Sequence, residues 1–328
     1  MRLLFVGDVM LGRLVNSLLE RRKPEYPWGD TLPIIKGADA RFCNLECVIS
    51  DHGEPWSQTP KYFHFRTGTK NVRALKAAGI DAVSIANNHV LDFEYEAAFE
   101  MLNVLDRENI RRAGVGHDYA EASVPAFIKV GDMAVAFIAF TDNEPAWAAY
   151  GSHPGVFFVP IDGKDIRAQK LFELIKETKT KADIVIVSVH WGPNWGYRPA
   201  PEHVPFAHAL IDSGADIIFG HSCHVFQGLE IYGGRPIIYS AGDFIDDYAV
   251  DEVEKNDESF IFVIETEGRL ISRVLMYPTV TKRFQATMAD EARAASIASK
   301  MINLCVELGT NVRWAEQERC LEVLPWSG

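Results

Sequence analysis

The chain has 328 residues, of which 48% are hydrophobic and 24% are charged, and this composition supports a large buried core. Lys and Arg number 33 against 45 Asp and Glu, so the net charge of −12 disfavours nucleic acid and anionic membrane surfaces as partners. Because the sequence has no signal-peptide pattern, no apolar run of about 20 residues and only scattered cysteines, we expect a cytoplasmic protein without a membrane span.

Short apolar runs rich in β-branched residues alternate with longer helical patterns, which is typical of an α/β fold. The predicted strands cover residues 3–6, 40–43, 82–85, 134–140, 184–189 and 217–219. The predicted helices among them cover residues 72–78, 95–108 and 205–213.

From Val225 onward the pattern becomes antiparallel, and we predict two hairpins. The first turns at Gly233 and Gly234, and the second turns at a Glu-Gly pair between two long apolar runs. A helix over residues 290–308 is predicted to close the chain. Since no repeat, low-complexity segment or Pro/Gly linker interrupts the sequence, we predict a single domain over residues 1–328.

An acidic stretch runs from Asp243 to Glu258, where eight acids face only Lys255. Such charge runs are more often solvated loops than binding sites. We therefore expect a solvated loop here.

Five apolar runs each end at a side chain that can bind a metal. The residues at these ends are Asp8, Glu46, Asn88 with His89, His190, and His221 with His224 just beyond. Ligands of α/β sheets bind beyond the carboxyl ends of the strands, so these side chains can converge. Carboxylate, amide and imidazole groups without a thiolate suit Mn, Zn, Fe or Co. We predict a centre of one or two divalent metal ions.

Each of these residues alone has an ordinary structural explanation. A His after a buried strand is more often hydrogen-bonded within the core, Glu46 fits a helix N-terminus, and Asn88 fits a turn. The coincidence of five strand ends favours the metal centre.

Five motifs in order resemble those of the CapA/PgsA poly-γ-glutamate capsule biosynthesis family, a branch of the calcineurin-like metallophosphoesterases. The motifs are GDVMLGR, NLECVIS, ANNHVLDF, HWGPNW and GHSCHVFQGLEIYGGRPIIYSAGDF. The resemblance covers nearly the whole chain. It implies an α/β fold in the form of a four-layer α/β/β/α metallophosphoesterase-like sandwich of mixed sheets, with the metal centre at the strand ends.

The resemblance also implies which residues hold the metals. They are Asp8, Glu46, Asn88, His190, His221 and His224. Glu46 would stand where the superfamily has a bridging aspartate, and Asn88 would be a ligating amide. His190 and His221 would complete the ligand set of one metal ion, and His224 would be a ligand of the other.

One position departs from the wider phosphoesterase pattern. Met10 stands where the first motif usually carries a His, which is the better ligand for these cations. The metal held by Asp8, Glu46 and His224 is therefore predicted to bind more weakly. Asp243, at another strand end, is the residue that could replace the missing His.

His89 would contact the substrate and act as a general acid, as the resemblance implies. Asp92, three residues on, could orient the His89 imidazole, although a helix cap is an equally good explanation for it. With a metal-activated water, this arrangement predicts a hydrolase for phosphoester or γ-glutamyl and other peptide-like substrates.

Three further residues are candidates for substrate binding. Arg13 follows the first strand end and can bind an anionic group in a bidentate manner. Trp195 and Arg198 follow His190 and fit a rim for a peptide-like or polymer chain, with ordinary packing as the even alternative.

Two other function classes stay open. The same centre could acidify a Cα–H bond, which would make the protein a metal-dependent peptide-modifying enzyme of the epimerase type. Alternatively, the protein could be a non-catalytic partner of a polymer synthetase in capsule biosynthesis.

Overall fold

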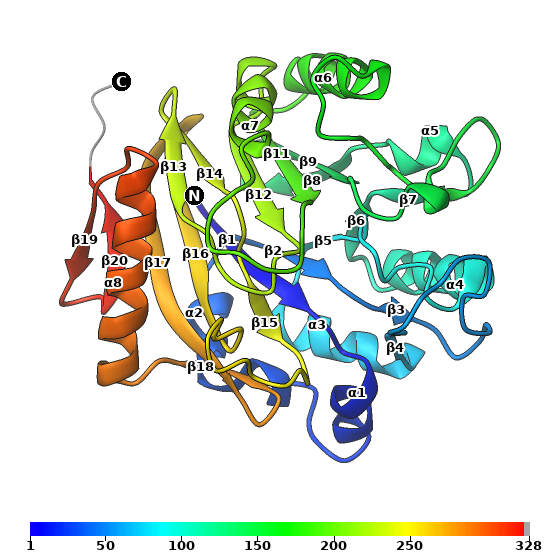
Figure 1. Ribbon diagram of the computed structural model, residues 1–328, viewed down its shortest axis with the longest axis horizontal. Helices are drawn as coiled ribbons and strands as arrows, with labels where there is room; N and C mark the ends of the chain where they lie inside the picture. Colours follow the sequence, from blue (N-terminus) through cyan, green and yellow to red (C-terminus); the bar gives the residue numbers. More distant parts are fainter. Residues whose placement is uncertain (325–328) are drawn as a thin grey trace.

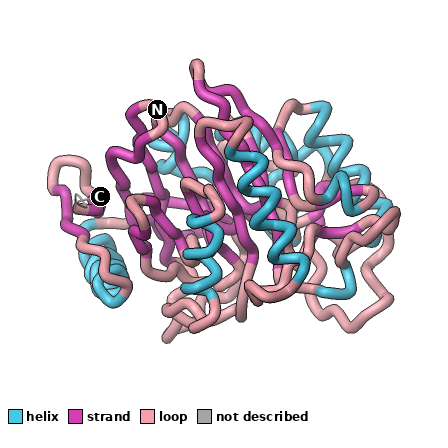
Figure 2. The backbone as a smooth tube through the Cα atoms, turned by 90° about the horizontal axis from the view of Figure 1, so that it is seen from above, coloured by secondary structure: helices cyan, strands magenta, loops and turns pink. Residues whose placement is uncertain are grey.

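The computed structural model, which describes residues 1–324, is built around two large β-sheets (Figures 1 and 2). Across the ten-stranded sheet lie β19 (Val312–Ala315), β20 (Cys320–Val323), β17 (Leu270–Lys282), β16 (Glu258–Glu267), β1 (Arg2–Val9), β2 (Ala40–Leu45), β5 (Ala82–Ser84) and β6 (Arg111–Ala113), with β15 (Asp243–Ile245) beside β1 and β18 (Gln285–Met288) beside β17. β1, β2, β5 and β6 are parallel, whereas β16 joins β1 in the antiparallel sense. The sheet is therefore mixed, as predicted.

The six-stranded sheet is also mixed. In order across it lie β13 (Leu229–Tyr232), β14 (Arg235–Ile238), β12 (Ile217–His221), β11 (Ile184–His190), β9 (Met133–Thr141) and β8 (Ala126–Val130). The four central strands are parallel, and β8 and β13 pair antiparallel at the two edges. Two short pairs complete the strands: β3 (Val48–Ile49) with β4 (Arg66–Thr67), and β7 (Val115–Gly116) with β10 (Gly155–Val156).

Helices cover the outer faces of both sheets (Figure 2). Outside the ten-stranded sheet lie α1 (Arg13–Leu19), α2 (Leu32–Lys36), α3 (Val72–Ala78) and α4 (Glu94–Arg107), and outside the six-stranded sheet lie α6 (Ile166–Lys179) and α7 (His203–Asp212). The remaining helices are α5 (Tyr119–Ala122), α8 (Glu291–Glu307), η1 (Tyr26–Thr31), η2 (Thr69–Asn71) and η3 (Pro145–Trp147). Among residues 1–324, no helix has the length and apolar character needed to cross a membrane.

The alternation of side chains along the strands produces the layers. In β1, Leu4 and Val6 pack with the helices, whereas Leu3 and Phe5 pack against the other sheet. β11 alternates in the same way, with Ile186 facing the ten-stranded sheet. Because the central strands of both sheets are buried on both faces, they are mainly apolar, as in β1 and β11. The predicted four-layer α/β/β/α sandwich is confirmed.

Aromatic rings fill the layer between the sheets. The ring centroids of Phe5 and Phe42, on neighbouring strands of one sheet, lie 5.0 Å apart. Phe137 of the other sheet lies 5.3 Å from Phe42, and Phe219 lies 5.3 Å from Phe5. These contacts fix how the carboxyl ends of the two sheets face each other.

The predicted strands, helices and hairpins are all found, but the prediction for the end of the chain was wrong. The predicted helix over residues 290–308 is α8, and two further strands, β19 and β20, follow it and extend the ten-stranded sheet. Each of these strands is only four residues long and contains one charged residue, Arg313 or Glu322, so the hydrophobic pattern is too short to identify. The assignment of one domain to residues 1–328 stays a prediction.

The prediction for the acidic stretch was also largely wrong. Asp243, Asp246 and Asp247 are buried, because β15 runs beside β1 into the interior. Glu258 is buried as well and binds Arg293 of α8. Only residues 249–253 form the exposed loop that the charge run indicated.

Gly7 interrupts the pairing of β1. The ladder between β1 and β2 shifts between Val6 and Asp8, which is an irregularity of the β-bulge type. A Cβ atom on Gly7 would lie 1.8 Å from the carbonyl oxygen of Gly242, so only glycine fits here. The bulge decides where the next side chain, Asp8, points.

Replacing Gly7 with Ala is expected to destabilise the protein by about 1–3 kcal/mol or more, because the new methyl group must push Gly242 away. Urea denaturation followed by circular dichroism would measure the loss. Gly163→Ala is the matched control, since a Cβ there meets no atom of the described chain within 4 Å. Equal midpoints for the two variants would contradict this interpretation of the bulge.

Candidate metal centre and active site

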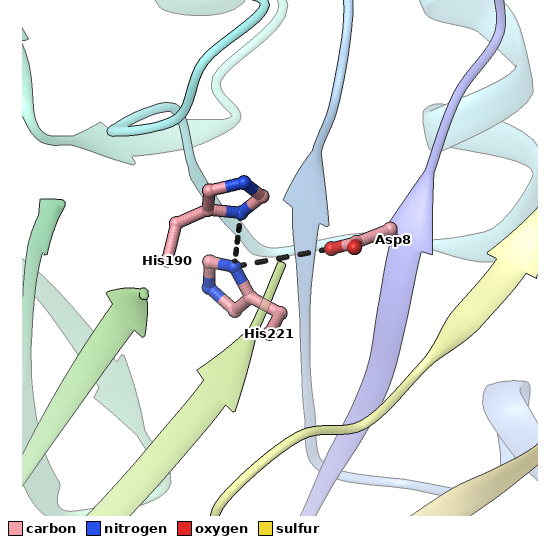
Figure 3. A group of neighbouring side chains, drawn as sticks. All are labelled: Asp8, His190 and His221. Atoms are coloured by element: carbon pink, nitrogen blue, oxygen red, sulfur yellow. Dashed lines mark hydrogen bonds and ion pairs between the residues drawn. The ribbon is translucent and has the colours of Figure 1, made fainter. Parts of the chain in front are cut away.

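Two histidines and one aspartate converge where the carboxyl ends of the two sheets meet. His190 and His221 are register partners on β11 and β12, and their Nδ1 atoms lie 2.9 Å apart. Asp8 faces them from β1, with its Oδ1 atom 3.8 Å from Nδ1 of His221 (Figure 3). The structure therefore brings together three of the predicted ligands from two different sheets.

The bulge at Gly7 turns Asp8 toward this site. Without it, Asp8 would continue the series of Leu4 and Val6, which pack on the outer helices. After the register shift, Asp8 pairs with Asn44 of β2, whose side-chain amide donates a hydrogen bond of 2.8 Å to Oδ1 of Asp8. This contact fixes the orientation of the carboxylate.

Asn44 is a site residue that the sequence analysis missed. Its Nδ2 atom also lies 3.4 Å from Nδ1 of His190. The signal was present in the sequence, because strand alternation places Asn44 on the same face as Phe42, which packs between the sheets.

A second group of ligands lies beside the first. It consists of Glu46, His224 and Asp243, whose ligand atoms lie within 4.8 Å of one another. Nδ1 of His224 is 3.0 Å from Oδ1 of Asp243. Since Asp243 is the register partner of Asp8, the two groups are neighbours. The grouping differs from the predicted one: Asp8 lies with His190 and His221, and Asp243 joins Glu46 and His224.

The residues of both groups fit divalent cations. Within residues 1–324, four buried atoms at this place lack any hydrogen-bond partner: Oδ2 of Asp8, Nε2 of His190, Oδ2 of Asp243 and Oδ1 of Asn88. Buried polar atoms are almost always paired, so several unpaired oxygen and nitrogen atoms around these residues favour a bound cation. Imidazole and carboxylate donors are those that Zn, Mn, Fe and Co accept.

The electrostatics of the site favour a cation as well. Burial lowers the pKa of His221 to about 3 and that of His190 well below its usual value, so both rings are neutral at pH 7 and offer lone pairs. Burial raises the pKa of Asp8 to about 6, and it raises the pKa values of Glu46 and Asp243 well above the usual carboxyl range. Bound cations would offset the cost of ionising these carboxyl groups.

The loop between β5 and α4 carries His89. Nδ1 of His89 lies 2.6 Å from Oδ2 of Asp92, and the Phe65 ring stacks on the imidazole at 3.9 Å. The N-cap of α4 is Phe93, without a side-chain cap bond, so Asp92 is not the helix cap. Burial lowers the pKa of His89 well below its usual value and raises that of Asp92 to about 7.

A cleft of about 540 Å³ opens beside the site. The predicted site residues Asn88, His89 and His224 line it, and so do two of the predicted substrate-binding residues, Arg13 and Trp195. The Trp195 ring lies 5.4 Å from the His224 ring, and Nε of Arg13 lies 3.4 Å from Oδ2 of the buried Asp247.

Arg198 does not line this cleft. Its guanidinium group forms a bidentate pair with Glu307 of α8, at 2.6 and 2.7 Å, and 68% of its side chain is exposed. The assignment of Arg198 to substrate binding therefore stays a prediction, and in the structure its guanidinium group is paired with Glu307.

Comparisons with known proteins agree with the motifs. A family model described as "Bacterial capsule synthesis protein PGA_cap" matches residues 2–248. Two Mycobacterium tuberculosis proteins, each named "Probable polyglutamine synthesis accessory protein", are 30% identical over 363 aligned residues, covering 97% of this chain and 94% of the relative. The Bacillus subtilis protein named "PGA biosynthesis protein CapA" is 31% identical over 245 residues, covering 74% of this chain and 62% of that protein.

The fold also has a solved counterpart. The crystal structure of a hypothetical protein from Thermus thermophilus covers 86% of this chain and 100% of its own, with a TM-score of 0.51 and 17% sequence identity. At this identity the likeness concerns the α/β fold alone.

Proposed function

The chain belongs to the bacterial capsule synthesis protein family PGA_cap, and we propose that it is a metal-dependent hydrolase of the metallophosphoesterase type. One observation carries the proposal: two groups of metal-type ligands are present, and His224 of the second group lines the same cleft as His89, which pairs with Asp92. The relatives are named for PGA and polyglutamine synthesis. We therefore propose a phosphoester or a γ-glutamyl or other peptide-like substrate.

Two metal ions would be held by separate sets of residues. Asp8, His190 and His221 would hold one, and Glu46, His224 and Asp243 would hold the other, with the amide oxygen of Asn88 as a further ligand. When bound, such ions polarise an ester or amide oxygen and lower the pKa of water toward about 7.

The second ring nitrogen of His221 also has a role. Nε2 of His221 lies 2.8 Å from the hydroxyl group of Ser188. This contact would fix the ring so that Nδ1 carries the lone pair facing Asp8 and His190.

His89 would transfer the proton. Because Nδ1 faces Asp92, the Nε2 atom is the one left for a substrate in the cleft. Asp92 would stabilise the imidazolium form, which can then protonate the leaving group. Burial disfavours this charged form in the free protein, so the negative charge of a bound substrate would be needed to favour it.

Two alternatives from the sequence are kept as outcomes of the test. The neutral form of His89 suits removal of a Cα proton, as an epimerase-type enzyme would require. The word "accessory" in the name of the mycobacterial relatives favours a polymer-synthesis partner for this chain, with or without catalysis.

The test is a set of assays on protein purified without chelator and supplied with Mn. A generic phosphodiester and monoester come first, then γ-glutamyl peptides, each with and without a chelator. Hydrolysis that the chelator abolishes supports the proposal. Exchange of a peptide Cα hydrogen in deuterated water without hydrolysis supports the epimerase-type alternative. Neither activity, together with tight binding to a polymer synthetase, supports the non-catalytic role.

A further inference from the structure

One wall of the cleft is made by a segment without regular secondary structure. Residues 60–65, here called the cleft wall, belong to the long connection between β3 and β4. Tyr62 and Phe63 of the wall line the cleft although they are 91% and 64% exposed. Since the segment has no ladder of its own, its position must come from contacts with other parts of the chain.

Lys61 of the wall has only 7% of its side chain exposed. Its ammonium group lies 3.0 Å from Oε1 of Glu144 and 3.5 Å from Oδ1 of Asp92, and it donates a hydrogen bond to the carbonyl oxygen of Asn88. It also lies 4.7 Å from the centre of the Trp147 ring. A lysine is almost never this buried unless it is paired, and here it is paired on several sides.

These partners come from both sheets. Asn88 and Asp92 lie in the loop after β5 of the ten-stranded sheet, whereas Glu144 follows β9 of the six-stranded sheet. Glu144 has a φ of +52°, a left-handed conformation that is uncommon for a residue other than glycine. The bond from Lys61 holds the Glu144 side chain in this strained turn.

Asp92 connects the wall to His89. Its Oδ2 atom accepts a hydrogen bond of 2.7 Å from the backbone amide of Phe65 and also contacts Nδ1 of His89. Its backbone carbonyl accepts a hydrogen bond of 2.8 Å from the amide of Trp56. Lys61 therefore binds a residue that contacts both the imidazole and the backbone of the wall.

We propose that Lys61 is a positioning residue that couples the cleft wall to the His89–Asp92 pair. Its ammonium group holds the wall, the β5–α4 loop and the Glu144 turn in one arrangement. The kinetic consequence rests on the proposed hydrolase function, whereas the structural consequence does not. Loss of Lys61 would make the cleft wall more mobile and would at the same time displace the His89 imidazole.

The test compares Lys61→Met, which keeps the apolar stem and removes the charge, with Lys61→Arg. In Lys61→Met we expect faster hydrogen exchange at the amides of Trp56 and Phe65, unchanged metal content, and a roughly 100-fold lower kcat/KM that includes both a higher KM and a lower kcat. Lys61→Arg keeps the positive charge, so its hydrogen exchange and its kcat/KM should be close to those of the wild type. Lys76→Met is the matched control, because Lys76 forms a surface ion pair with Glu108.

Glu144→Gln is a second variant in case Lys61→Met fails to fold. It weakens only the link to the six-stranded sheet, and we expect a smaller change in the same direction. Unchanged exchange at Trp56 and Phe65 in a folded Lys61→Met variant would overturn the proposal. A wild type without hydrolytic activity would count against the proposed function alone, since the exchange measurement still decides the role of Lys61.

Discussion

Replacing His89 with Asn is expected to lower turnover by about 100- to 10,000-fold, the usual contribution of a general acid or base. His89 lines the cleft, and Asp92 and the Phe65 ring hold its imidazole. Asn has a similar size but cannot donate a proton to a leaving group. Steady-state kinetics on the best ester or γ-glutamyl substrate would measure the effect.

Metal content distinguishes a proton-transfer role for His89 from a ligand role. Elemental analysis of His89→Asn should match the wild type, since His89 belongs to neither ligand group. His117→Asn serves as the control, because His117 lies on the surface beside Glu121, away from the cleft. Loss of metal from His89→Asn would show that the imidazole is a ligand, and full activity would show that the proton comes from elsewhere.

Replacing His190 with Ala is expected to lower metal affinity by roughly 10- to 100-fold or more. Loss of a residue that only hydrogen-bonds to a metal ligand already costs that much, and His190 would be a ligand itself. His190 is fully buried, and its Nδ1 atom lies against His221. The sheet does not need the imidazole, so the variant should fold. Elemental analysis and metal titration, with circular dichroism as a check on folding, would measure the loss.

Asp243→Asn provides the complementary experiment. Asp243 lies with Glu46 and His224, so this variant should lose the second metal and retain the one held by His190. A metal-free wild type that neither Mn nor Zn reconstitutes would contradict the metal centre. Loss of both metals in either variant would mean that the two positions fill only together.

Much of the fold and part of the candidate site could be predicted from the sequence. The central strands of both sheets are buried on both faces, so they appear in the sequence as short apolar runs, and the residue that ends each run is easy to identify. Asp8, His190 and His221 were found in this way, and the structure brings them together. Their roles as ligands stay a prediction.

The missed features depend on contacts between distant segments. Lys61 lies in an irregular segment, where no periodicity indicates burial, and its partners lie on other loops. Asp243 was named as a possible replacement ligand, but its burial was missed, because charge counting cannot tell a buried strand end from the exposed loop beside it. The shift at Gly7, which turns Asp8 inward, depends on the close approach of Gly242.

The pairing of β1 has a consequence for synthesis of the chain. Arg2 is the register partner of Glu265, and Asp8 is the register partner of Asp243, so one edge of β1 is completed only after more than 200 further residues have been made. At the usual speed of a ribosome, synthesis of the residues between β1 and β16 takes roughly 10 to 50 s. During this time one edge of β1 has no complete partner strand. Contacts of such high sequence separation slow folding. Nascent chains that stop before residue 258 therefore lack β16, the antiparallel partner of β1.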